Sequence, residues 1–109
     1  MIRTLVILSG VLLAANVHAS GDAEKGKQKA AQVCVACHGA DGTKPSAPDQ
    51  PVLAGQYYDY LVRALTDYQL GRRTNPIMNG FASQLSKQEI QDVAAWFSSQ
   101  TTTSLHNQR

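Results

Sequence analysis

Residues 34–38 read Cys34-Val35-Ala36-Cys37-His38, and this stretch decides how the rest of the chain is interpreted. Two residues three apart in a helical turn lie on one face, so both cysteines can reach the two vinyl groups along one side of a porphyrin. His38, next to the second cysteine, then falls beneath the iron and can supply a neutral imidazole nitrogen. Cys-x-x-Cys-His is the attachment signature of covalently bound haem. The sequence therefore predicts one haem c, with thioether bonds to Cys34 and Cys37 and with His38 as an iron ligand.

Other uses of a cysteine pair explain this stretch less well. A structural disulfide or a thioredoxin-like redox pair accounts for the two cysteines, which are the only two in the chain, but not for the histidine directly after them. A zinc site needs further ligands, and apart from His38 the mature part of the chain offers only His106, in a polar tail. Haem is the favoured interpretation.

The first 19 residues have the pattern of a secretory signal peptide. Arg3 supplies a positive start, the stretch from Leu5 to Ala15 is mostly apolar, and Val17-His18-Ala19 ends in a small residue. The apolar run is about half the length that a membrane-spanning helix requires. We expect cleavage after Ala19, export to the bacterial periplasm and no stable membrane insertion afterwards; the alternative is an uncleaved anchor.

Removing the signal changes the charge balance of this 109-residue chain. Ten basic residues lose Arg3, and nine then face eight acidic ones, so the net charge falls from +2 to +1. Two haem propionates would bring it close to −1. The largest basic cluster is Arg72-Arg73, which argues against a nucleic acid or an anionic membrane surface as a partner.

Three helical patterns account for most of residues 20–100, which we expect to form one domain before a flexible polar tail at 101–109. A first helix follows Asp22, a plausible N-cap. A second follows Gly55 and ends at Gly71, and a third starts at the capping box Ser86–Glu89. The helical stripes are Ala23, Gly26, Ala30 and Val33; Tyr58, Leu61, Val62, Leu65 and Tyr68; and Ile90, Val93, Ala94 and Phe97. The fold class is all-α, with three main helices and loops around the haem.

Two segments between these helices read as loops. Three prolines fall within seven residues between Pro45 and Pro51, a density that no regular element tolerates. Residues 74–80 also read as a loop, which is stiffened by Pro76 and carries Met78.

Met78 is the candidate for the second axial ligand of the iron. The chain has two methionines, and Met1 leaves with the signal, so Met78 is the only methionine of the mature protein. Its thioether can face His38 across the haem. The alternative is a flexible side chain that fills a gap in the core, but Met78 does not fall on a helical core stripe.

Taken together, these residues resemble a class I c-type cytochrome, and most closely one domain of the bacterial two-haem periplasmic cytochromes. The resemblance covers about Ala23 to Gln100. It rests on the Cys-x-x-Cys-His stretch, on Pro51-Val52-Leu53-Ala54-Gly55-Gln56, on Asn75-Pro76-Ile77-Met78 and on Val93-Ala94-Ala95-Trp96-Phe97. A single Cys-x-x-Cys-His makes this chain similar to half of a two-haem protein.

The resemblance implies roles that spacing alone does not establish. It implies that the Pro51 carbonyl accepts a hydrogen bond from His38 and that Leu53 and Phe97 pack on the haem. It also implies a close crossing of the first and last helices, where Gly26 meets Trp96. Many relatives carry an aromatic residue where this chain has Ala30, so the fine packing of that crossing is left open. Arg72 and Arg73 are candidate partners of the haem propionates, the alternative being that both are solvated.

The expected function is one-electron transport and not enzymatic catalysis. With His38 and Met78 both on a low-spin haem iron, no open position is left for a substrate, and methionine ligation raises the reduction potential. Expected partners are redox proteins of the respiratory chain, namely a membrane donor complex and a terminal oxidase or reductase, and the protein itself is expected to be a monomer or weak homodimer. Two alternatives are gas binding or peroxidase-type catalysis at a five-coordinate haem, and a role as a tethered subunit of a larger oxidoreductase.

Overall fold

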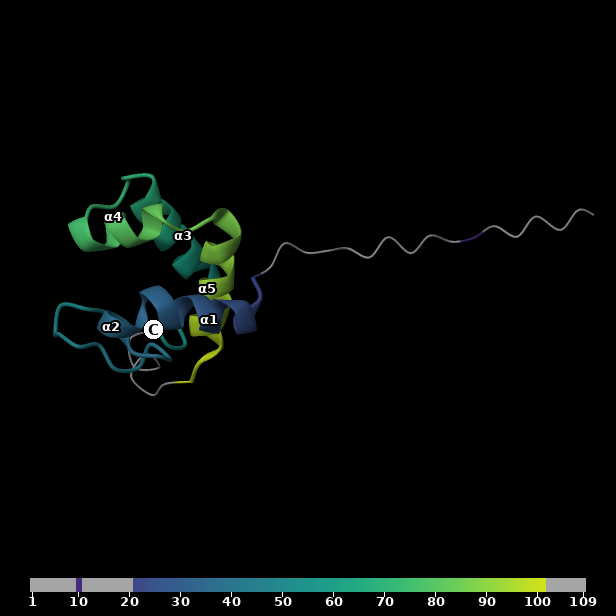
Figure 1. Cartoon of the computed structure of the whole chain (residues 1–109), viewed down its shortest axis with the longest axis horizontal. Helices are drawn as coiled ribbons and strands as arrows, with labels where there is room; N and C mark the ends of the chain where they lie inside the picture. Colours follow the sequence, from purple (N-terminus) through teal and green to yellow (C-terminus); the bar gives the residue numbers. More distant parts are fainter. Residues whose placement is uncertain (1–9, 11–20, 102–109) are drawn as a thin grey trace, which may run out of the picture.

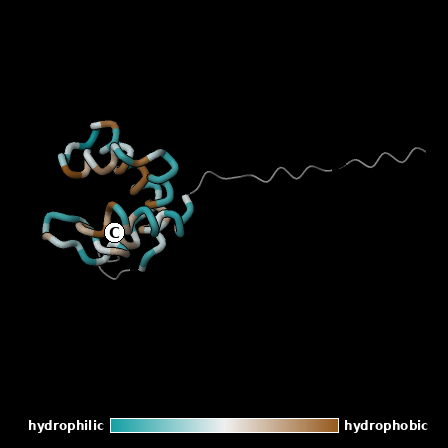
Figure 2. Tube along the Cα trace, viewed as in Figure 1, coloured by the Kyte–Doolittle hydropathy of each residue, from teal (hydrophilic) through white to brown (hydrophobic). Residues whose placement is uncertain are grey.

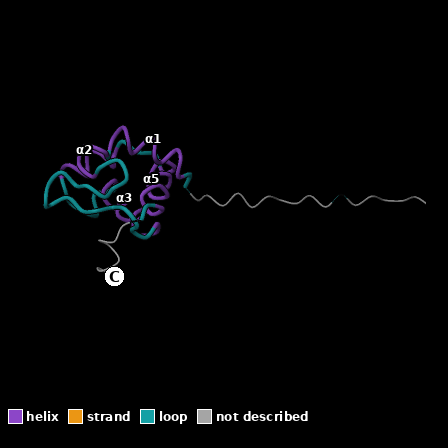
Figure 3. The backbone as a smooth tube through the Cα atoms, turned by 90° about the horizontal axis from the view of Figure 1, so that it is seen from below, coloured by secondary structure: helices purple, strands orange, loops and turns teal. Residues whose placement is uncertain are grey.

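The computed structural model describes residue 10 and residues 21–101, and these residues form helices and loops without a strand (Figures 1 and 3). The helices are α1 (Ala23–Val33), α2 (Val35–His38), α3 (Tyr58–Gln69), α4 (Pro76–Ser83) and α5 (Lys87–Ser99). The predicted all-α class is confirmed, and α1, α3 and α5 lie where the three main helices were expected. None of the helices in this part of the chain combines the length and apolar character that a membrane span requires. Apart from Gly10, the predicted signal peptide lies outside the described residues.

The closest helix contact is the crossing of α1 and α5. At Gly26 an added Cβ would lie 1.8 Å from the carbonyl oxygen of Asp92 and 3.0 Å from the Cβ of Trp96, so only glycine fits between the two backbones. The start of α1 is fixed to the same helix, because the backbone N–H of Asp22 donates to the buried carboxylate of Asp92 at 2.8 Å. The implied meeting of Gly26 with Trp96 is present, and the tightest contact there is with the α5 backbone.

Both predicted helix starts on these two helices are confirmed. The carboxylate of Asp22 accepts from the first N–H groups of α1, and Ser86 and Glu89 form a reciprocal capping box at the start of α5. Glu89 also forms an ion pair with Lys29 of α1. The hydrogen bond from Lys29 and that from the Ser86 backbone lower the pKa of Glu89, so its carboxylate is held ionised to lower pH than usual.

The hydrophobic core lies where α1, α3 and α5 meet. Its buried members come from all three helices: Ala30, Leu61, Val93, Ala94 and Phe97. Half-buried side chains, including Leu53 and Trp96, pack around them. The core therefore joins the helix before the Cys-x-x-Cys-His stretch to the C-terminal helix.

The long segment between α2 and α3 folds back onto α5. Gly42 has φ +78°, and a Cβ there would lie 2.8 Å from the ring of Phe97. The backbone N–H of Gly55 donates to the Phe97 carbonyl at 2.9 Å, and the indole N–H of Trp96 donates to the Ala40 carbonyl at 3.0 Å. These contacts hold the proline-rich loop beside the histidine that precedes it.

The prediction of a loop over residues 74–80 is wrong, because Pro76–Ser83 form helix α4. Asn75 is the N-cap, and its side-chain oxygen accepts from the N–H groups of Ile77 and Met78, both at 3.1 Å. Pro76 stands at the first helical position, where its missing N–H costs nothing and its fixed φ suits the helix. Asn followed by Pro favours a turn or a helix start, and the structure adopts the helix start.

Candidate cofactor site

One cavity of about 710 Å³ lies between the helices and is lined by residues that are far apart in the sequence. Figure 1 shows α3 and α4 in the upper part of the described chain and α1 and α2 in the lower part, and Figure 2 shows hydrophobic stretches of the chain in both. The lining includes every predicted site residue, namely Cys34, Cys37, His38, Pro51, Leu53, Met78 and Phe97.

The two cysteines stand at the junction of α1 and α2. Cys34 is the residue between these helices and Cys37 lies within α2, and both are half-buried free thiols on the cavity wall. Burial raises the pKa of Cys34 to about 11, and the neighbouring Cys37 adds to this. The Cys34 thiol is therefore protonated at pH 7, and with Cys37 it would hold a haem by thioether bonds to its vinyl groups.

His38 is oriented by a backbone carbonyl. The side chain is 7% exposed, and its Nδ1 lies 2.9 Å from the carbonyl oxygen of Pro51. A carbonyl can only accept, so Nδ1 carries the proton of the neutral ring and Nε2 keeps its lone pair. This is the contact that the resemblance implies, and it prepares Nε2 as a metal ligand.

Met78 reaches the same cavity from α4. Its backbone N–H is held by the Asn75 side chain, and its own side chain is half-buried. The structure therefore brings His38 and Met78 to one cavity, although the two residues come from different helices.

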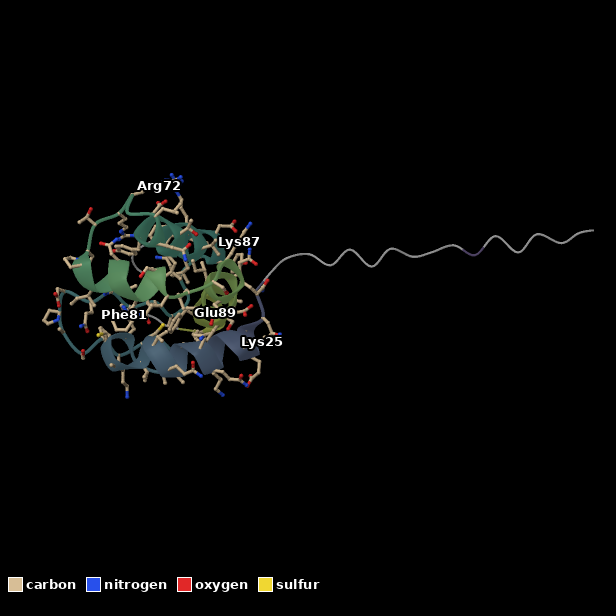
Figure 4. The ribbon with its side chains drawn as sticks, turned by 45° about the horizontal axis from the view of Figure 1, so that its top comes forward. Lys25, Arg72, Phe81, Lys87 and Glu89 are labelled. Atoms are coloured by element: carbon tan, nitrogen blue, oxygen red, sulfur yellow. The ribbon has the colours of Figure 1, made fainter. Side chains whose placement is uncertain are left out.

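The cavity wall fits a flat apolar cofactor. Ile77 is 62% exposed and Phe81 is 39% exposed, yet both line the cavity from α4. Figure 4 shows Phe81 on the side of α4 that faces α1 and α2. Phe97, only 1% exposed, and the half-buried Leu53 contribute further apolar wall. A porphyrin against Ile77 and Phe81 would cover apolar surface that is otherwise in water. With two thiols and a free imidazole Nε2 beside it, the residue set fits haem c.

The two arginines considered for the propionates lie differently. Arg73 is the only lysine or arginine among the described residues that line the cavity. Its Nη1 donates to the Tyr60 hydroxyl at 3.3 Å, and its guanidinium lies 4.8 Å from the centre of the Tyr68 ring. The hydrogen bond to Tyr60 raises the pKa of Arg73. Arg72 does not line the cavity but pairs with Asp67 at 3.8 Å, and Figure 4 shows it at the outer surface.

Sequence reasoning did not find the polar residues that hold α4. The amide of Asn79 joins α4 to the end of α3, and Asn75 caps α4. The sequence pattern that could have indicated this helix start is Asn75 directly before Pro76, with a second asparagine, Asn79, four residues after Asn75. That pattern is typical of an N-cap with a neighbour one turn further along the helix.

The sequence of this chain is similar to those of known proteins. The family model described as "Cytochrome c" matches residues 23–101. The chain is 52% identical over 83 residues to cytochrome c4 of Pseudomonas aeruginosa, an alignment that covers 76% of this chain and 40% of that protein. It is 42% identical over 84 residues to cytochrome c-554(548) of Halomonas halodenitrificans, with 74% of this chain and 99% of that protein covered.

A solved structure is also similar. The crystal structure of reduced recombinant cytochrome c4 from Pseudomonas stutzeri matches with a TM-score of 0.69 and 44% sequence identity. The match covers 75% of this chain and 47% of that chain, so this chain spans about half the length of the cytochrome c4 proteins that it matches.

Proposed function

The chain belongs to the cytochrome c family, whose haem c is bound covalently, and on that premise we propose that it is a periplasmic one-electron carrier with histidine–methionine axial ligation. The haem supplies an iron that exchanges one electron between its ferrous and ferric states. The observation that carries the proposal is the single cavity that His38 and Met78 share with the two cysteines. In this role the protein makes and breaks no bonds of a substrate.

Each predicted residue has a distinct task in this proposal. Cys34 and Cys37 hold the haem by thioether bonds. The Nε2 of His38 binds the iron, and the Pro51 carbonyl keeps that ring in one orientation and makes it a better donor. The thioether of Met78 binds the opposite face, and methionine in this place favours the ferrous state. Keeping both ligands in both oxidation states limits rearrangement during electron transfer.

Two apolar side chains exclude water from the site. Leu53 and Phe97 line the cavity, and Phe97 is also part of the core shared by α1, α3 and α5. Apolar side chains beside a bound haem would lower the dielectric constant around the iron, which strengthens the influence of nearby charges on its potential.

Arg73 is the proposed partner of a haem propionate. It is the cation on the cavity wall, and Tyr60 and Tyr68 hold its guanidinium there. A guanidinium presents several donors in one plane, which suits a carboxylate. Arg72, which pairs with Asp67 at the surface, is not part of this proposal.

The proposed setting is the periplasm, after removal of residues 1–19 as a signal peptide. The partners are then redox proteins, with a membrane donor complex on one side and a terminal oxidase or reductase on the other. The near-neutral net charge that remains after cleavage does not favour a nucleic acid partner.

The spectrum of the ferric holoprotein tests the axial ligands. A sulfur-to-iron band in the near infrared is expected in the wild type and should disappear in Met78→Ala. Leu70→Ala is the matched control, because Leu70 is an exposed apolar residue outside the cavity lining. If Met78→Ala keeps the band pattern of the wild type, Met78 is not the ligand and the carrier proposal loses its basis. A five-coordinate ferric spectrum in the wild type would point instead to gas binding or peroxidase-type catalysis.

A further inference from the structure

The side-chain amide of Asn79, the residue after Met78, joins three parts of the chain. Its Nδ2 donates to the carbonyl oxygen of Tyr68 at 2.8 Å and to that of Arg73 at 2.9 Å. Its Oδ1 accepts from the backbone N–H of Asn75 at 2.9 Å. One half-buried side chain therefore connects the last turn of α3, the loop after it and the N-cap of α4.

These hydrogen bonds are made to backbone groups at which one helix ends and the next begins. The last carbonyls of a helix and the N–H groups at the start of the next one have no partner within their own helix. Tyr68 lies in the last turn of α3, where its carbonyl also accepts from the N–H of Gly71 at 3.3 Å, and Asn75 is the N-cap of α4. Asn79 supplies a donor to the first end and an acceptor to the second. It thus closes the turn between α3 and α4 with side-chain atoms.

The same network holds the backbone of Met78. The Oδ1 of Asn75 accepts from the N–H of Met78 at 3.1 Å, and Asn75 is itself held by Asn79. At the other end of α4, the Nε2 of Gln69 donates to the carbonyls of Ala82 and Leu85 at 3.2 and 2.6 Å. The main helix neighbour of α4 is α3, and these amides fasten α4 to it along the cavity wall.

We propose that Asn79 is a positioning residue, which holds α4 against α3 so that Met78 stays on the iron and resists displacement by an external ligand. This rests on the proposed function, because it takes Met78 as the axial ligand. When an external ligand replaces Met78, α4 is released from the cavity and the hydrogen bonds of Asn79 to α3 open with it. A substitution that removes these hydrogen bonds therefore destabilises only the state with Met78 on the iron, and the external ligand binds more tightly than in the wild type.

Two substitutions of Asn79 test this in the haem-loaded protein. Asn79→Ala removes all three hydrogen bonds, and alanine is the better helix former, so helix propensity works against the expected effect. Asn79→Asp keeps the size and the acceptor toward Asn75 but places an oxygen where Nδ2 donated to two carbonyls. An acidic residue in the first turns of a helix is otherwise favourable. Gln84→Ala is the matched control, since Gln84 is an exposed amide at the C-terminal end of α4.

The measurement is the affinity of imidazole for the ferric holoprotein, followed through loss of the sulfur-to-iron band. We expect imidazole to bind about 10- to 30-fold more tightly to Asn79→Ala and Asn79→Asp than to the wild type, the effect of losing two ordinary hydrogen bonds. The affinity of Gln84→Ala should match that of the wild type. Imidazole affinities in both Asn79 variants within about twofold of the wild type would overturn the proposal, because the hydrogen bonds then have no influence on ligand displacement.

A second measurement separates positioning from a general structural role. Chemical unfolding is compared with and without saturating imidazole. Without imidazole, Asn79→Ala should unfold at lower denaturant than the wild type; with imidazole, the two should unfold together, because the Asn79 hydrogen bonds are already open. Equal destabilisation under both conditions would contradict the proposal. Absence of the band in the wild type would instead overturn the axial role of Met78, and the positioning role with it.

Discussion

Gly26→Ala is expected to destabilise the protein through the crossing of α1 and α5. The new Cβ would lie 1.8 Å from the Asp92 carbonyl oxygen and 3.0 Å from the Cβ of Trp96. The first of these contacts is with backbone, which cannot rotate away, so the helices must separate by roughly 1.5 Å to reach ordinary van der Waals distance. Because this crossing holds α1, whose last residue Val33 directly precedes Cys34, the strain acts on the helix that leads to the haem attachment.

The magnitude follows from two opposing terms. Overpacking of a closed contact costs up to about 3 kcal/mol. Replacing glycine by alanine inside a helix returns about 1 kcal/mol through backbone entropy. The net loss is about 2 kcal/mol, which lowers the melting temperature of a domain of this size by about 8–16 °C.

Gly80→Ala is the matched control for this experiment. Gly80 also lies inside a helix, α4, and a Cβ there would meet nothing within 4 Å. Only the entropy term applies, so this variant should gain about 0.5–1 kcal/mol. Equilibrium unfolding of both holoproteins in guanidinium chloride, followed by far-ultraviolet circular dichroism, gives the comparison. If the stability of Gly26→Ala stays within about 0.5 kcal/mol of the wild type, the crossing is not as close as described.

Three further predictions concern charge, pH and the loop after the attachment site. Arg73→Gln should lower the reduction potential by an amount on the order of 50 mV, because a positive charge near the iron disfavours the ferric state; potentiometric titration should find a much smaller change in Arg72→Gln, and equal changes in the two would contradict the assignment of Arg73 to the cavity. The folded-state pKa of Glu89 is lowered, so the ion pair and hydrogen bonds of its carboxylate stabilise the protein above the ordinary pKa of 4.5, and this stabilisation is lost as the pH falls through the lower folded value. The free energy of unfolding of Glu89→Gln should therefore depend less steeply on pH between about pH 5 and 2 than that of the wild type. An equally steep dependence in the two proteins would refute this. Trp96→Phe keeps an aromatic ring beside the core and under Lys27 but loses the hydrogen bond to the Ala40 carbonyl and part of the ring. This should cost at least about 1 kcal/mol in guanidinium unfolding, and an unaltered midpoint would show that this bond is not stabilising.

The sequence was sufficient for features that depend on local patterns. Three features can be recognised from the local sequence alone, because their interacting groups are within four residues of one another. They are the Cys-x-x-Cys-His stretch, the N-cap Asp22 and the Ser86–Glu89 capping box. The three stripes of apolar residues likewise predicted α1, α3 and α5, since helices of this length show their period directly.

The sequence was insufficient where distant contacts decide between two local options. Asn75-Pro76 suits both a turn and a helix start. The helix is stabilised by two distant amides: that of Asn79 reaches from α4 to the Tyr68 carbonyl of α3, and that of Gln69 reaches from α3 to the Leu85 carbonyl beyond α4. The choice between Arg72 and Arg73 depends in the same way on the turn after α3. There Gly71 has φ +75°, and both arginine N–H groups donate to the Asp67 carbonyl, so adjacent side chains leave the turn in different directions.

Different helices support the two sides of the cavity, and this has a consequence for protein engineering. The attachment side is built on the crossing of α1 and α5, whereas α4 has α3 as its main helix neighbour and is fastened to it by side-chain amides. We therefore expect residues 70–85 to be exchangeable as a unit if the buried Ala82 and Leu85 are kept apolar. Transplanting the corresponding segment from a relative, with Gln69 kept as its anchor, should retune the redox behaviour of the haem while the scaffold that captures it during maturation stays untouched.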